Sequence, residues 1–113
     1  MAKYETHLTG NFDELLAAVH DGILRGSVSA SYEEGGDYCL CGTVRCAIRA
    51  YERYSAFGSN RVSLHVTLLG DGENLIVCAI ATGGSQAVFF KINTVGEETF
   101  LDRLIKIVEN YKR

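Results

Sequence analysis

Residues that can hold an anion or move a proton gather between positions 49 and 65. An arginine side chain offers a planar fork of N–H donors that matches a carboxylate or a phosphate, and hydroxyl and imidazole groups add further hydrogen bonds. Alternation along the chain predicts that these residues share one side of two neighbouring strands. We therefore predict a polar binding surface, for an anionic small molecule or for a second copy of the chain, formed by Arg49, Tyr51, Arg53, Arg61, Ser63 and His65.

A glycine-rich segment at 83–86 is a second candidate. Backbone amides in such a turn can bind an anion because glycine allows close approach, so we add Gly83, Gly84 and Ser85 to the candidate ligand-binding residues. Ser85 with His65 as its base would make a small enzyme, which is our alternative. The Gly-x-Ser-x-Gly pattern of serine hydrolases is absent, however, and a glycine pair between strands is usually a turn. We therefore expect no catalytic residue and favour a non-enzymatic protein.

The four cysteines raise the question of a metal site. Cys39 and Cys41 share a side of the chain while Cys46 falls on the other, so a single tetrahedral site would need a distorted strand. No Cys-x-x-Cys occurs, and a reducing compartment keeps thiols free. We expect free thiols, no metal and no cofactor, in a cytoplasmic protein.

Length and composition predict a single domain over residues 1–113. The chain has 113 residues, of which 47% are hydrophobic and 22% are charged, and this suits one core. Its formal net charge of -3 gives no general attraction to nucleic acid. The apolar run of a signal peptide or a membrane span is missing, so we expect no membrane association.

Two amphipathic helices are expected, one near each end. The first begins at Asn11, whose side chain can accept an amide of the first turn, and stops at Gly26. Its apolar face consists of Phe12, Leu15, Leu16, Val19 and Ile23. The second follows a capping box at 94–97 and runs to about Tyr111. Its apolar face consists of Phe100, Leu101, Leu104, Ile105 and Val108.

Alternating segments predict about five to six strands. The first spans 3–9, with Tyr4, Thr6 and Leu8 on one side. The others are expected at 27–32, followed by an exposed turn at 33–37, and then at 43–53, 61–68, 74–82 and 86–93.

The two strands before residue 69 are expected to bury their even-numbered residues: Val44, Cys46, Ile48 and Ala50 in one, Val62, Leu64, Val66 and Leu68 in the other. Paired residues share a face, so their numbers must then have an even sum. A sum of 116 pairs Arg53 with Ser63 and Tyr51 with His65, and it keeps Arg53 from facing Arg61.

A tight turn is expected at Asp71 and Gly72, with Gly70 paired to Glu73. With this pairing, the residues that face the core are even-numbered before the turn and odd-numbered after it. Leu75, Val77, Ala79 and Ala81 then face the core, and Ile76, Cys78 and Ile80 face outward beside Ser63 and His65. An apolar border on a polar face predicts that something covers this face, and we expect a homodimer.

The order strand, helix, strands, helix predicts an α+β fold. We expect an antiparallel sheet with both helices on one face, similar to TATA-binding-protein-like or helix-grip-like folds. Such an analogy implies no function.

Four segments also resemble a known family: Arg-Tyr-Ser at 53–55, Asn-Arg-Val-Ser-Leu at 60–64, Gly-Gly-Ser-Gln-Ala-Val-Phe-Phe-Lys at 83–91 and Gly-Glu-Glu-Thr-Phe-Leu at 96–101. The chain resembles, over nearly its whole length, an uncharacterised bacterial family of short proteins, the domain of unknown function 6054 family. The resemblance implies no activity or ligand. It implies a family signature of Arg53, Ser55, Asn60, Arg61, Ser63, Gly83, Gly84, Ser85 and Lys91.

Overall fold

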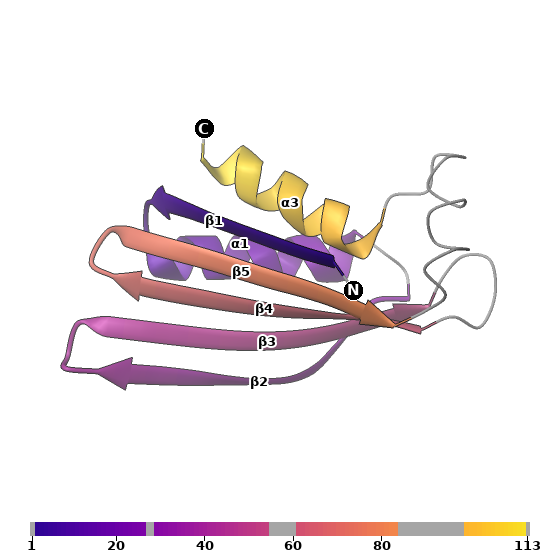
Figure 1. Ribbon diagram of the computed structural model, residues 1–113, viewed down its shortest axis with the longest axis horizontal. Coiled ribbons are helices and arrows are strands. Elements are labelled where there is room, and N and C mark those ends of the chain that lie inside the picture. The colour runs from indigo at the N-terminus through magenta and orange to yellow at the C-terminus, as the bar shows by residue number, and fades with distance from the viewer. Residues whose placement is uncertain (1, 27–28, 55–60, 84–98, 113) are drawn as a thin grey trace.

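The described part of the chain is one antiparallel sheet with two helices. The computed structural model describes residues 2–26, 29–54, 61–83 and 99–112. In chain order these form β1 (Ala2–Thr9), α1 (Phe12–Arg25), β2 (Ser31–Leu40), β3 (Val44–Tyr54), β4 (Arg61–Asp71), β5 (Asn74–Gly83) and α3 (Phe100–Tyr111) (Figure 1). The strands lie in the spatial order β1-β5-β4-β3-β2, which confirms the α+β class. The expected strand at 86–93 and the capping box at 94–97 lie outside the described residues.

Both helices contribute to one hydrophobic core on the same side of the sheet, which we call the inner face. α1 provides Leu15, Val19 and Ile23, which are buried together with inward residues of β4 and β5. α3 lies beside β1 and α1 and adds Phe100, Leu104 and Val108 (Figure 1). The opposite side of the sheet, the outer face, has no helix over it in the part of the chain that the structure describes (Figure 1). The apolar faces predicted for both helices are therefore confirmed.

Local chemistry explains where the helices begin. The backbone amide of Glu14 donates to the Asn11 side-chain oxygen at 2.9 Å, as predicted for an N-cap. α1 ends at Arg25, one residue before Gly26. At the start of α3 the amide of Asp102 donates to Thr99 Oγ1 at 2.8 Å.

The predicted register between β3 and β4 is wrong. Arg53 pairs with Val62, Tyr51 with Leu64 and Tyr54 with Arg61, so the paired numbers sum to 115 rather than 116. Even residues of β4 are buried as expected, but on β3 the buried residues are Ala47 and Tyr51. Paired residues still share a face; the error lies in the assumption that β3 buries its even-numbered side.

The arginines of β3 explain why its odd-numbered side, and not its even-numbered side, faces the core. Arg45 and Arg53 point to the inner face, where their guanidinium groups lie 4.1 Å and 4.9 Å from the ring centroids of Phe12 and Phe100. A long arginine stem covers apolar surface while its charged end reaches the rim of the core, so an inward row of arginines is compatible with burial. Ile48 and its even-numbered neighbours consequently face outward.

β2 also differs from expectation. The segment predicted as a turn at 33–37 lies within β2, and a bulge between Tyr32 and Glu34 shifts the register there. Gly35 is required by close approach, because a Cβ at this position would overlap the Tyr32 hydroxyl and the Ile48 carbonyl. The chain turns instead at 41–43, where Cys41 has a φ of 56°.

The β4–β5 turn is displaced by one residue from its expected position. Asp71 pairs with Asn74, which leaves Gly72 and Glu73 as the two-residue loop, and Gly72 has a φ of 62°. The switch of inward parity is nevertheless confirmed. The residues buried on β5 are Leu75, Val77, Ala79 and Ala81.

A pair of aspartate substitutions on β3 tests the observed register. Ala47→Asp places a charge in the core and is expected to lower the free energy of unfolding by about 3 kcal/mol or more. Ile48→Asp places the same charge on the outer face and is expected to cost less than about 1 kcal/mol. Urea unfolding of both variants in dilute solution measures the difference. If Ile48→Asp were the more damaging substitution, the register with even residues inward would be correct.

The contact between β1 and α3 predicts a loss of stability in alkaline solution. The Tyr4 hydroxyl donates to the Glu109 carboxylate, and burial, followed by this carboxylate, raises the pKa of Tyr4 to about 12. The unfolded chain loses the tyrosine proton near its ordinary pKa of 10.0, so the free energy of unfolding should fall between that value and about 12. Urea unfolding of Tyr4→Phe across this range should show a shallower fall than wild type. Parallel curves for the two proteins would contradict the assignment.

Candidate functional site

The structure divides the predicted polar surface between the two faces of the sheet. Arg49, Tyr51 and Arg53 lie on the inner face with the other odd residues of β3. Arg61, Ser63 and His65 lie on the outer face, because their even-numbered neighbours on β4 are buried. The expectation that these six residues share one face is therefore wrong. Two separate surfaces result.

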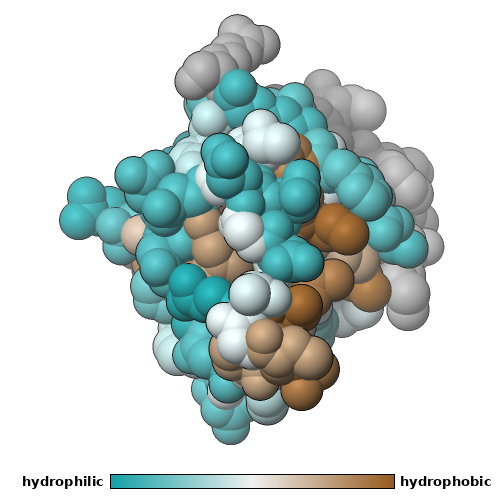
Figure 2. Space-filling view, turned by 90° about the vertical axis from the view of Figure 1, so that its left-hand side faces the viewer, coloured by the Kyte–Doolittle hydropathy of each residue, from teal (hydrophilic) through white to brown (hydrophobic). Residues whose placement is uncertain are grey.

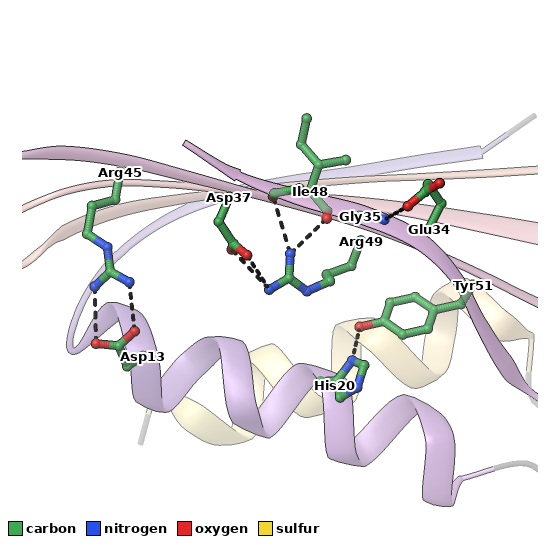
Figure 3. Close-up of polar contacts among 10 residues, drawn as sticks. Asp13, His20, Glu34, Gly35, Asp37, Arg45, Ile48, Arg49 and Tyr51 are labelled. Carbon is green, nitrogen blue, oxygen red and sulfur yellow. Dashed lines mark hydrogen bonds and ion pairs between the residues drawn. The ribbon is translucent and has the colours of Figure 1, made fainter. Parts of the chain in front are cut away.

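On the inner face, Arg45 makes a two-pronged ion pair with Asp13 near the start of α1. Its two terminal nitrogens lie 3.1 Å and 2.8 Å from the two carboxylate oxygens (Figure 3). This hydrogen bonding holds the pKa of Asp13 below its ordinary value. Both groups are exposed, so the pair orients the helix start more than it stabilises the fold.

The side chain of Arg49 is more enclosed than that of Arg45. Its Nη1 donates to the carbonyl oxygens of Ile48 at 2.9 Å and Gly36 at 3.3 Å, and its Nη2 lies 3.0 Å from Asp37 Oδ1. The arginine side chain is only 15% exposed, whereas that of Asp37 is 68% exposed. Figure 3 shows the guanidinium group held between the edge strands and α1. The cation is thus fixed in place while its carboxylate partner stays open to solvent.

Three rings pack together next to Arg49. Tyr51 has no exposed surface, and its hydroxyl oxygen lies 2.9 Å from His20 Nδ1 on α1 (Figure 3). Tyr32 completes the group, with ring centroids 5.2 Å from His20 and 5.8 Å from Tyr51. Burial raises the pKa of Tyr51, so its hydroxyl keeps its proton at physiological pH. The rings of His20, Tyr32 and Tyr51, which we call the aromatic wall, lie between α1 and the hairpin of β2 and β3, which we call the edge hairpin.

The outer face is organised in rows that cross the sheet. One row is entirely uncharged apart from a histidine at its end: Tyr38, Cys46, Leu69, Ile76 and His7 are successive ladder partners from β2 to β1. The adjacent row contains Ile48, Thr67 and Cys78 and ends at Glu5 on β1. Figure 2 views the molecule from the end that carries the β2–β3 and β4–β5 turns, and it shows hydrophobic side chains gathered on the side away from α1. These two rows therefore form a largely apolar band across the outer face, and the row nearest the turns adds Leu40 and Val44 together with Asp71.

The opposite end of the outer face is polar. Arg61 Nε donates to Glu52 Oε1 at 2.8 Å, and Ser63 Oγ donates to Glu52 Oε2 at 3.3 Å. Glu52 is thus a residue of this polar surface that the sequence reasoning missed. Its charge at an even position of β3 was a signal that this side does not face the core.

The other candidate residues are placed as follows. His65 lies between Ala50 and Ile80 in the ladder, and neither neighbour can exchange a proton with it. Gly83 ends β5 with a φ of 99°. Gly84 and Ser85 lie outside the described residues, so the idea of Ser85 with His65 stays untested.

The cysteines are free, and Cys39 and Cys41 are exposed near the β2–β3 turn. Within the described ranges, no three His, Cys, Asp or Glu side chains come together in a way that could hold a metal ion. Neither described helix combines the length and the apolar character needed to cross a membrane.

Comparison with known proteins identifies the family. A family model described as "Family of unknown function (DUF6054)" matches residues 1–112. The chain belongs to this family. The match covers all the described elements, from β1 to α3. No curated protein and no solved structure matches the chain, and the DUF6054 description itself names no activity.

The Tyr51 hydroxyl provides a test of the aromatic wall. Tyr51→Phe removes the contact with His20 but keeps the ring, so we expect the free energy of unfolding to fall by about 1 kcal/mol. Tyr54→Phe is the matched control, because Tyr54 is exposed on the outer face. Urea unfolding measures both variants. Equal stability of Tyr51→Phe and wild type would show that this hydrogen bond contributes nothing.

Proposed function

We propose that this DUF6054 protein is a non-enzymatic binding domain that self-associates through its outer sheet face. One observation carries the proposal. Of the six large hydrophobic side chains that are exposed among the described residues, five lie on this face: Tyr38, Leu40, Ile48, Tyr54 and Leu69. Tyr38 is 60% exposed and Leu40 is 69% exposed. Four of them, all except Tyr54, lie in neighbouring rows, and contiguous exposed apolar surface of this kind is typical of interaction sites.

The size of the face fits a dimer. Five strands spaced about 4.8 Å apart and about eight residues long present roughly 600 Å² in projection. A stable complex buries roughly 800 Å² of accessible surface per partner, and accessible area exceeds projected area. Two sheets packed face to face would therefore bury enough surface for a stable homodimer.

The distribution of charge supports a second copy as the occupant. Charged groups lie at the margins, where Lys3 pairs with Glu5 and Arg61 pairs with Glu52. The central apolar rows carry no like charges that would repel an identical face, and a two-fold axis brings a patch against itself. The alternatives, a small anion-binding protein or a small enzyme that uses Ser85 or His65, lack a comparable feature on this face.

We also infer that residues 1–113 form a single cytoplasmic domain with a TATA-binding-protein-like or helix-grip-like fold. The order of the described elements supports the fold, since one strand and one helix precede four antiparallel strands and a last helix. Exposed free thiols at Cys39 and Cys41 support a reducing compartment.

Sedimentation equilibrium tests self-association. The wild-type chain is expected to weigh about twice its 12.4 kDa monomer mass at about 100 μM. Ile48→Asp should weaken the dimer about tenfold or more, because an apolar contact is replaced by a buried charge. Ala17→Asp, an equal change on the exposed surface of α1, should leave the dimer intact. A wild-type protein that stays monomeric at this concentration would contradict the proposal. This is the result expected if the outer face binds a different partner instead of a second copy of the chain.

A further inference from the structure

A groove between α1 and the edge hairpin lies on the side opposite the outer face. It has a volume of about 350 Å³ and is lined by Asp13, Leu16, Ala17, His20, Tyr32 and Arg49. Small-molecule sites begin at about 300 Å³, so the groove can hold one small ring with a short substituent. We propose that this groove binds a small aromatic monocarboxylate, with the carboxylate on Arg49 and the ring against the aromatic wall.

At the polar end of the site, Arg49 is already bound by a carboxylate of the protein itself. The Asp37 carboxylate lies 3.0 Å and 3.3 Å from Arg49 Nη2, so it uses the donor that a ligand carboxylate would need. Two backbone carbonyls hold the other arm of the guanidinium, so the cation needs no rearrangement to accept a new anion. Because Asp37 is mostly exposed, it can turn into solvent at little cost. Arginine held in this way is a preorganised carboxylate site.

The aromatic end accounts for the preference for a ring. Tyr32 is 44% exposed and leaves part of its ring open to the groove, while the His20 ring is held by its contact with Tyr51. Aromatic ligands pack favourably against such rings. Ala17 and Leu16 provide small apolar surface on the helix side of the groove.

The charge balance limits the ligand to one negative charge. Arg49 is the only cation that lines the groove in the described part of the chain. Asp13, the acidic residue among the described residues that line the groove, is paired with Arg45. A phosphate ester or a dicarboxylate would therefore bring more negative charge than the site can match.

Titration of the full chain with benzoate, followed by amide NMR shifts and by calorimetry, tests the proposal. Benzoate should shift the amides of Ala17, His20, Tyr32 and Arg49, while benzyl alcohol, acetate and inorganic phosphate should bind at least about tenfold more weakly. Asp37→Asn removes the internal competitor, so benzoate should bind severalfold more tightly to this variant.

Two substitutions should weaken benzoate binding by different routes. Arg49→Gln removes the cation and is expected to weaken benzoate binding about tenfold or more. Ala17→Leu fills the groove from an exposed helix position without changing any charge, so it gives an answer even if Arg49→Gln unfolds the protein. Arg61→Gln, on the outer face, is the matched control and should bind as wild type does.

Three results would overturn the proposal: benzoate shifts that are absent or map elsewhere, acetate binding as tight as benzoate binding, or an Asp37→Asn variant that binds no more tightly. The outer face shares no residue with the groove, so failure of this test and failure of self-association are independent.

Discussion

Burial of Tyr51 beneath α1 is the constraint on which both surfaces of this protein depend. The side chain is completely enclosed, and its hydroxyl meets His20 on the helix. Once Tyr51 faces the core, every odd residue of β3 must lie on the inner face and every even residue on the outer face, because side chains alternate along a strand. The pairing of Tyr51 with Leu64 then sets the register with β4. Neither surface can change without moving this residue.

The same constraint gives the two faces opposite chemistry. The inner rim collects Arg45, Arg49 and Arg53, each of which lies against a ring, a carboxylate or backbone carbonyls. The outer face receives Ile48 and Cys46 instead, and so it carries apolar surface with no helix over it. A sheet that is apolar on both sides is normally covered on both sides. This is the physical basis of the proposed self-association, while the rim supplies the polar groups of the proposed ligand groove.

The arginine-rich edge of the inner face is tied to the backbone of the neighbouring strands. Arg49 is held by two carbonyl groups of the strands beside it, and Gly36, one of these partners, lies in the segment that composition alone predicts to be a turn. The bulge after Tyr32 and the close approach at Gly35 turn this segment into a strand. Without β2 in this position, Asp37 would not face Arg49 and the groove would have no outer wall.

The elements whose signal is local could be predicted from the sequence alone. Helical periodicity and the Asn11 cap predicted α1, and alternation with a glycine turn predicted the buried side of β5, because each depends on residues close together in the chain. Only the tertiary structure decided the parity of β3. Its even-numbered side, with Val44, Cys46 and Ile48, is more apolar than its odd-numbered side with three arginines, so hydrophobicity favoured the side that does not face the core. Packing against α1 makes the choice, since Tyr51 fits beneath the helix and the arginines reach the rim, and that choice separated Arg49 from Arg61 and Ser63.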